Sequence, residues 1–178
     1  ALPEDVQAEE FDCPVNFFAK KTYDIWRVAA AAEAVRAAAK LLRAARKPLI
    51  IAGGGVHYSD ACATLQKFAE GAGIPVAVTQ AGKGALLEKH PLGLGAVGVT
   101  GTLAANRIAT DADVVLVVGT RLSDFTTASK TQFQNPRVRF ISINVNAADA
   151  AKHGALPLLG DARATLAALG RALAGWRV

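Results

Sequence analysis

Three consecutive glycines end an apolar run in the segment "PLIIAGGGVHYSD", which covers Pro48 to Asp60. A glycine-rich turn between a strand and a helix can bind phosphate, because its backbone N–H groups approach the anion closely. The dinucleotide fingerprint G-x-G-x-x-G also needs an acidic residue about 20 positions later for the ribose. Gly53 and Gly55 supply the first two glycines, but Tyr58 occupies the third position. The next predicted strand ends in Thr79-Gln80, so the acidic residue is missing as well. A conventional NAD site is therefore not expected, and the turn is either a phosphate loop or a packing feature.

A literal G-x-G-x-x-G match occurs in "GLGAVG", at Gly93, Gly95 and Gly98. It follows the dipeptide "HP" rather than a long buried strand, and the next predicted helix begins only near Thr100. In a chain with 16 glycines such a match arises easily by chance. The pattern favours a turn at the end of a strand.

Two other segments carry cations that could meet an anion. In "GTRLSDFTT" (Gly119–Thr127), Arg121 follows a predicted buried strand, and arginine is suited to bidentate phosphate contact. An Arg121–Asp124 ion pair that only orders the loop is the alternative. Lys83 stands in "AGKG" between two glycines, which can adopt many backbone conformations. It could either bind an anion or be a solvated loop residue.

Patterns for nucleophilic or metal chemistry are weak. His57, His90 and His153 fall in separate predicted loops without a carboxylate at motif spacing, which favours surface or packing roles. Cys13 and Cys62 have no metal-ligand spacing and no histidine expected beside them, so they are predicted to be ordinary thiols of a cytoplasmic protein. We predict no catalytic residue and no metal ligand.

Composition narrows the class of protein. The 178 residues are 52% hydrophobic and 20% charged, which is typical of one globular α/β domain with a sizeable core. The apolar stretches are too short to span a bilayer, and no secretory signal opens the chain. The net charge of +5 is scattered rather than gathered into a basic stripe with aromatics, so neither nucleic acid nor membrane is an expected partner. Since the chain contains no methionine, we expect an excised piece of a longer protein.

The spacing of hydrophobic residues, together with the glycines and prolines that end helices and strands, predicts alternating strands and helices. They follow an irregular first segment, residues 1–25, that resembles an arm or linker. Asp161 is predicted to cap the last helix, and Ser59 or Asp60 the second one. The predicted strands are 48–53, 74–79, 114–120, 138–145 and 155–161, and the predicted helices are 26–46, 61–71, one from Thr100 or Thr102 onward, and 162–174.

This alternation predicts an α/β fold with a doubly wound, mainly parallel sheet of about six strands, similar to the Rossmann fold. Ligands of such sheets bind at the carboxyl ends of the strands. The glycines expected at that edge are Gly53–Gly55, Gly82, Gly84 and Gly119.

Five ordered blocks resemble the central domain of thiamine diphosphate-dependent enzymes of the acetolactate synthase type: "KPLIIAGGGV", "GIPVAVTQAGKGALLEKHPLGLGAVGVTGTLAAN", "ADVVLVVGTRLSDFTT", "ISINVNAADAAKH" and "GDARATLAAL". The resemblance begins near Trp26, so residues 26–178 would be the central domain and residues 1–25 the linker that precedes it. "AGGGVHYS", "TQAGKGAL" and "GTRLSDFTT" are most similar to the ring-opening members that act on a cyclic 1,2-dione in myo-inositol degradation.

The resemblance implies that thiamine diphosphate and Mg²⁺ are held by the first and third domains of a parent protein. The third domain carries a G-D-G…N-N segment, whereas Gly160-Asp161 begins "GDAR" and lacks the second glycine. This chain alone is therefore not expected to catalyse a reaction. Its partners would be the flanking domains, in a parent that is a homodimer or homotetramer.

In flavin-containing relatives the central domain binds FAD along the strand ends. The sequence departs from them where "INVN" replaces "IDID", so that Asn144 and Asn146 stand in place of two carboxylates and adenosine recognition is weakened. Three hypotheses remain: a structural domain with a vestigial pocket, an FAD-binding domain of an acetolactate synthase-like enzyme, and a stand-alone nucleotide-binding or deacylase-like domain. The positions that match the FAD site are Gly53, Gly54, Gly55, Thr79, Gln80, Ala81, Gly82, Arg121 and Asn144.

Overall fold

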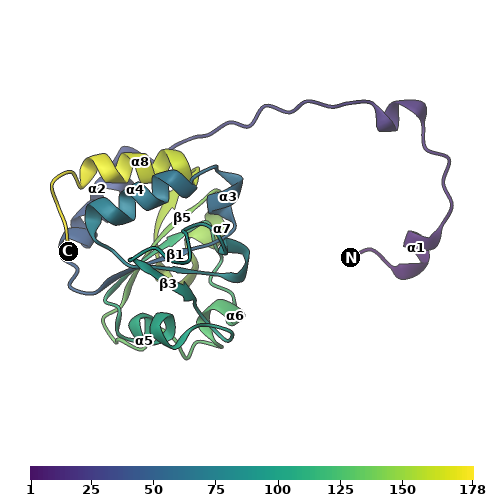
Figure 1. Ribbon diagram of the computed structural model, residues 1–178. Coiled ribbons are helices and arrows are strands. Elements are labelled where there is room, and N and C mark those ends of the chain that lie inside the picture. The colour runs from purple at the N-terminus through teal and green to yellow at the C-terminus, as the bar shows by residue number, and fades with distance from the viewer.

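Six short apolar segments form one parallel sheet in the order β3-β2-β1-β4-β5-β6 in the computed structural model, which describes residues 1–178 (Figure 1). The two central strands are buried along their whole length, because helices cover both faces of the sheet. The predicted doubly wound, Rossmann-like α/β fold is thereby confirmed. The strands are β1 (Pro48–Ala52), β2 (Val76–Val78), β3 (Gly93–Ala96), β4 (Val114–Val118), β5 (Arg139–Asn144) and β6 (Leu156–Leu159).

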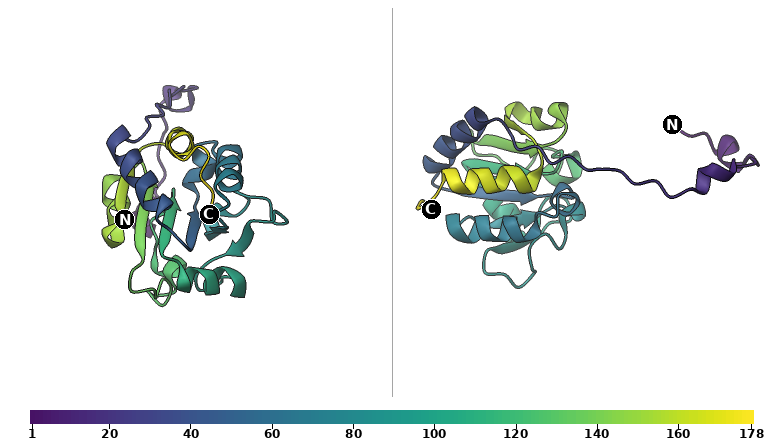
Figure 2. Two further views of the ribbon diagram at one scale, coloured as in Figure 1. Left: turned by 90° about the vertical axis from the view of Figure 1, so that its left-hand side faces the viewer. Right: turned by 90° about the horizontal axis from the view of Figure 1, so that it is seen from above.

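The helices form a layer on each side of the sheet (Figures 1 and 2). Helices α2 (Ala32–Arg43), α4 (Cys62–Ala72) and α8 (Ala162–Ala172) pack on one face, over a core cluster of 27 buried residues. Helix α5 (Leu103–Asp111) covers the other face, over a cluster of 10. The shorter helices are α1 (Glu4–Ala8), η1 (Val15–Phe18), α3 (Gly55–Tyr58), η2 (Gln80–Gly82), α6 (Asp124–Thr127), α7 (Ala147–Ala150) and η3 (Lys152–Gly154).

Three local predictions were wrong. The first long helix begins at Ala32 rather than Trp26, because the chain before it is extended and the Ala30 N–H donates to the Thr165 hydroxyl. Neither Ser59 nor Asp60 caps α4, which has no side-chain cap. The "GLGA" segment is the edge strand β3, paired with β2, rather than a turn at a strand end.

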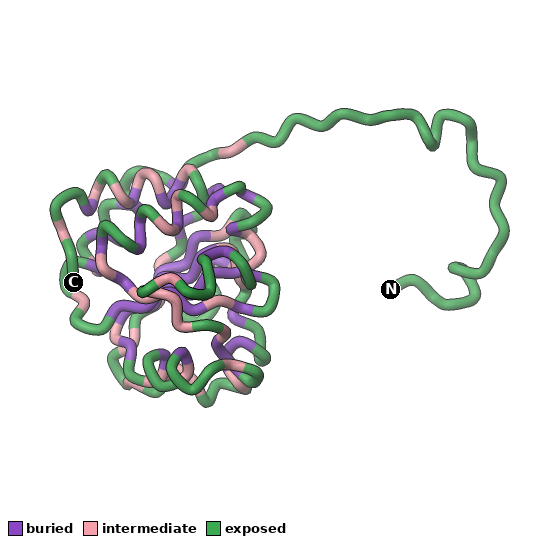
Figure 3. Tube along the Cα trace, viewed as in Figure 1, coloured by how far each residue is buried: buried purple, intermediate pink, exposed green.

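The first 26 residues are all exposed, and they run away from the sheet as an extended arm (Figures 1 and 3). Arg27 anchors the arm where it joins the body, donating from Nη2 to Asp60 at 2.7 Å and from Nη1 to Asp161 at 2.9 Å. Asp161 also accepts from the Ala164 N–H at 2.9 Å, and so caps α8 as predicted.

The carboxyl group of Asp161 is therefore stabilised in its charged form. Burial raises its pKa, but hydrogen bonds from the Ala164 N–H, from Ser59 and from Arg27 outweigh burial and leave the pKa below its ordinary value. A pKa lowered by folding stabilises the folded state above the unfolded pKa, and that stabilisation is lost as the pH falls through the folded pKa.

Replacing Asp161 with Asn tests this anchor. We expect Asp161→Asn to lower the free energy of unfolding at pH 7 by about 1–2 kcal/mol, since the amide still caps α8 but no longer pairs with a cation. The difference from the unmodified chain should shrink as the pH falls below about 4. Urea unfolding at several pH values measures it, with the exposed Asp111→Asn as the control. A difference that stays constant with pH would contradict the role of the charge.

The turn after β1 lies directly against the segment after β4. A Cβ built on Gly55 would lie 2.6 Å from the Gly119 Cα, and one built on Gly53 would lie 2.5 Å from the Gly119 oxygen. A Cβ on Gly82 would overlap the carbonyl oxygen of Ala52. These glycines are thus required by contact between backbone segments.

The three adjacent glycines allow a matched comparison. Gly54 has helical dihedrals, and the atoms nearest to its added Cβ would be the Ala81 Cβ at 3.2 Å and the Ala81 carbonyl oxygen at 3.4 Å, without the overlap found at Gly55. We expect Gly55→Ala to destabilise the chain by roughly 1–3 kcal/mol, and Gly54→Ala to change its stability by less than about 0.5 kcal/mol. Urea unfolding followed by circular dichroism measures the free energy of unfolding of both variants. Equal losses of stability would show that the backbone contact at Gly55 does not require glycine.

Candidate functional site

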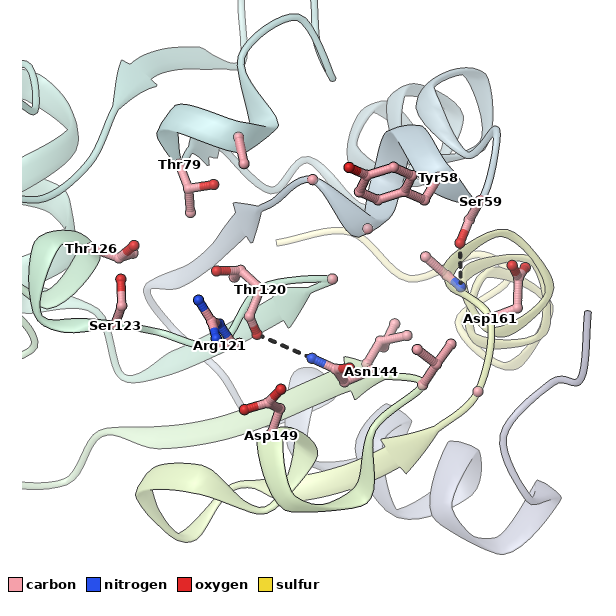
Figure 4. A pocket seen from close by; sticks show the side chains of 18 of the residues that line it. Tyr58, Ser59, Thr79, Thr120, Arg121, Ser123, Thr126, Asn144, Asp149 and Asp161 are labelled. Atoms are coloured by element: carbon pink, nitrogen blue, oxygen red, sulfur yellow. Dashed lines mark hydrogen bonds between the residues drawn. The ribbon is translucent and has the colours of Figure 1, made fainter. Parts of the chain in front are cut away.

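A pocket of about 1060 Å³ opens at the carboxyl ends of β1, β4 and β5 (Figure 4). The turns that follow these strands form its walls, together with η2 after β2 and the segment that precedes α8. The position is the one at which parallel α/β sheets bind ligands. The structure therefore has a pocket at the edge of the sheet where the sequence predicted a site.

Most of the predicted cofactor-binding residues meet in this pocket. Gly53 and Gly82 do not line it, because they are buried in the contacts between the β1, β2 and β4 turns. Whether the pocket binds a cofactor stays a prediction. The seven predicted residues that line it are Gly54, Gly55, Thr79, Gln80, Ala81, Arg121 and Asn144.

The backbone donors of the triple glycine are largely used inside the fold. The Gly53 N–H donates to the Val118 carbonyl at 2.8 Å, and the Gly55 N–H to the Gly119 carbonyl at 3.0 Å. The next two N–H groups, of Val56 and His57, donate back to the turn itself. A phosphate loop needs several such donors directed at one anion. In this turn they stabilise the strand-to-helix junction instead.

Arg121 is the one arginine near the middle of the pocket, where it lies beside Thr120 and Ser123 (Figure 4). The Arg121–Asp124 ion pair, which was the alternative to an anion-binding role, does not form. The carboxylate of the pocket residue Asp149 pairs with Lys152 at 2.7 Å. The exposed Arg121 guanidinium makes no ion pair in the structure. It is therefore free to meet an anionic group of a ligand.

Asn144 uses its amide to shape the end of β5. Its Nδ2 donates to the Thr120 carbonyl at 3.4 Å, and its Oδ1 accepts from the Asn146 N–H at 3.0 Å. Asn146 in turn caps α7 by accepting from the Asp149 N–H at 3.1 Å. A carboxylate at position 144 could still accept from Asn146, but it could not donate to Thr120. The two asparagines thus hold the loop, in place of presenting carboxylates to a ribose.

Several pocket residues were not predicted. Ser123 was passed over, although it lies in the loop quoted for Arg121, whereas Thr126 of the same loop was expected at this edge of the sheet and does line the pocket. The arm contributes Ile25, Trp26 and Val28, because it passes the pocket mouth before it joins the body. No local pattern in the sequence indicates that the arm passes the pocket, since its path depends on the ion pairs of Arg27 with the distant residues Asp60 and Asp161.

One prediction about the cysteines was wrong. The Cys62 Sγ lies 3.5 Å from the His57 Nδ1, because both flank the short turn that joins α3 to α4. The His57 Nε2 lies 3.0 Å from the carbonyl oxygen of Lys83, outside the pocket. Lys83 thus contacts the histidine through its backbone and does not reach the predicted site.

The other two histidines contact polar groups of neighbouring segments. The His90 Nε2 lies 3.0 Å from a Glu70 oxygen, and this hydrogen bond lowers the pKa of the exposed Glu70 carboxyl. The His153 Nε2 lies 3.2 Å from the Leu122 carbonyl. In the whole structure, no group of three His, Cys, Asp or Glu side chains is placed to hold a metal ion. None of the helices has the length and hydropathy that crossing a membrane requires.

Comparison with known proteins agrees with this geometry. The family described as "Thiamine pyrophosphate enzyme, central domain" matches residues 35–169. A protein of Geobacillus thermodenitrificans named 3D-(3,5/4)-trihydroxycyclohexane-1,2-dione hydrolase is 50% identical over 97% of this chain and 27% of its own length. One of the same name from Clostridium perfringens is 51% identical over 92% of this chain and 26% of its own length. The chain therefore spans about a quarter of the relatives that it matches.

Among solved structures, an X-ray structure from Mycobacterium smegmatis, named for thiamin diphosphate dependence, superposes with a TM-score of 0.70. The match covers 86% of this chain and 30% of that one at 24% identity, so it supports the fold. Because the family match covers most of the sheet and its helices, the chain belongs to the family of thiamine pyrophosphate enzyme central domains.

Proposed function

We propose that this chain is the non-catalytic central domain of a cytoplasmic hydrolase that depends on thiamine diphosphate and Mg²⁺ and opens the ring of trihydroxycyclohexane-1,2-dione in myo-inositol degradation. The observation that carries the proposal is the identity of about half of all residues to relatives of that name, over nearly the whole chain. Two unpaired cysteines are consistent with a reducing compartment. Residues 26–178 would form the domain, and residues 1–25 would link it to its neighbours.

The domain's own residues supply a scaffold for that reaction. Thiamine diphosphate, when bound, supplies the nucleophilic carbon for cleavage beside a carbonyl group. This chain offers no cluster of acidic or imidazole ligands for the magnesium that accompanies it. We assign both to the flanking domains, which would assemble as a homodimer or homotetramer, and assign to this chain the rigid sheet against which they pack.

In this proposal the strand-end pocket is a vestigial nucleotide site. Two observations support a vestigial role. The Gly53 and Gly55 N–H groups donate to carbonyls of the neighbouring strand and turn, and Asn144 holds the Thr120 carbonyl where flavin-containing relatives would carry an acid. Both leave few groups that could recognise the pyrophosphate and ribose of FAD.

A second candidate is an FAD-binding domain of an acetolactate synthase-like enzyme. The observation that favours it is the exposed Arg121, which faces a pocket of about 1060 Å³ without an ion-pair partner. A guanidinium placed in this way can bind a pyrophosphate. No observation favours the stand-alone nucleotide-binding or deacylase-like hypothesis.

Turnover by the whole protein separates the two candidates. With thiamine diphosphate and Mg²⁺ added, we expect loss of trihydroxycyclohexane-1,2-dione at the same rate with and without FAD, and no loss of pyruvate. Arg121→Ala should change the rate less than about twofold, because the residue touches no reacting group in this proposal. Turnover of pyruvate that requires FAD would contradict the proposal and support the second candidate.

A further inference from the structure

Cys62 and His57 form a pair of side chains outside the strand-end pocket. The Cys62 Sγ lies 3.5 Å from the His57 Nδ1, and neither residue lines that pocket. Helix α3 carries the histidine and α4 begins with the cysteine (Figure 1), so the short turn between these helices fixes the separation of the two side chains. A thiol within hydrogen-bond distance of an imidazole is the arrangement in which a histidine activates a cysteine as a nucleophile.

A third group determines which nitrogen of the imidazole carries a proton. The His57 Nε2 lies 3.0 Å from the carbonyl oxygen of Lys83. A carbonyl oxygen can only accept a hydrogen bond, so Nε2 carries the hydrogen that is donated to it. In the neutral ring Nδ1 is then unprotonated and accepts from the Cys62 thiol. The Lys83 carbonyl thus holds the ring in the tautomer and the orientation that a base for Cys62 needs.

The beginning of α4 offers further donors to a thiolate at Cys62. Helix α4 has no side-chain cap, and the N–H groups of Cys62, Ala63 and Thr64 donate to no other group of the protein. These unpaired donors form the positive end of the helix dipole. Reactive cysteines are typically found at helix N-termini and beside histidines, and Cys62 combines both positions.

The pair is placed so that a small molecule can reach it. His57 is exposed, and Cys62 is half-buried, with one side packed against the larger core cluster. Beside the ring stands Gly84, where an added Cβ would meet only the His57 Cε1, at 3.8 Å. The loop after η2 therefore fixes the imidazole through one carbonyl group and leaves the neighbouring space open.

We propose that Cys62 is a site of reversible thiol modification, at which a low-molecular-weight disulfide forms a mixed disulfide with the protein. His57 is the base that takes the thiol proton. The inference depends on the geometry of the pair and is independent of the proposed reaction of the whole protein.

The step is a thiol–disulfide exchange. The His57 Nδ1 takes the proton from the Cys62 thiol, and Sγ attacks one sulfur of the disulfide. A bond forms between Sγ and that sulfur while the original S–S bond breaks, and the second sulfur leaves as a thiolate. His57 then gives its proton to the leaving thiolate. The protein thiol is oxidised, and the released half of the disulfide is reduced to a thiol.

A comparison of folded and unfolded protein tests the proposal without any substitution. The whole protein is incubated with glutathione disulfide at pH 7, and mass spectrometry of the peptide that contains Cys62 follows the addition. We expect Cys62 to react at least about threefold faster in the folded protein than in the protein unfolded in urea. A thiol that serves only packing would react more slowly in the folded protein, because it is partly covered there.

Removal of the base provides a second test. His57→Gln keeps a polar side chain on α3 but has no basic nitrogen, and we expect it to slow the addition at Cys62 at least about threefold. The control is His153→Gln, which replaces a histidine that also lies against a carbonyl oxygen, that of Leu122 at 3.2 Å, but contacts no thiol. This control should leave the rate unchanged. Excess reduced glutathione should remove the adduct, as expected of a mixed disulfide.

Four results would overturn the proposal. Equal or slower reaction in the folded protein would show that the pair does not activate the thiol, and this comparison decides even if His57→Gln fails to fold. A rate unchanged by His57→Gln would show that the imidazole is not the base. An adduct that reduced glutathione does not remove would not be a mixed disulfide. No addition to the folded whole protein would show that another part of that protein covers Cys62.

Discussion

The contact between the backbone after β1 and the backbone after β4 is the constraint on which the strand-end architecture depends. Gly55 and Gly119 approach so closely that an added Cβ would lie 2.6 Å from the opposing Cα. The same absence of side chains lets Gly82 lie against Ala52. These contacts hold together the turns after β1, β2 and β4. The loop that carries Arg121 follows β4, so the contacts fix the position at which this loop begins. The pocket is thus a consequence of how the sheet closes at its carboxyl edge.

This packing decides what the triple glycine can do. A turn that binds phosphate presents its N–H groups to the ligand, whereas here Gly53 and Gly55 donate to carbonyls of β4 and the turn after it. Gly54 and Gly55 both line the pocket, but of the two only Gly54 could carry a Cβ without overlapping backbone atoms. A sequence pattern shared with nucleotide sites is therefore compatible with a purely structural role. Membership in the thiamine pyrophosphate family fits such a role, since the family is defined here by a domain rather than by a complete active site.

The order of strands and helices could be predicted because each carries its own local signal: an apolar run such as "VVLVV", or the cap supplied by Asp161. The pocket's position followed from the fold class. Features that depend on distant contacts could not be predicted. Ser59 was expected to cap the helix beside it, yet its hydroxyl accepts from the Ala162 N–H at 3.3 Å, more than 100 residues away. The edge strand β3 was missed because its glycines carry no β propensity, and pairing with β2 alone defines it.

Binding of FAD to this chain tests the central claim most directly. Equilibrium dialysis against FAD, read by flavin absorbance, needs neither the substrate nor the flanking domains. If the glycine turn serves packing and Asn144 holds the adjacent loop, the chain should retain no flavin at micromolar concentrations. Stoichiometric retention of FAD that is lost in Arg121→Ala would contradict the account, and would establish the strand-end pocket as a working cofactor site.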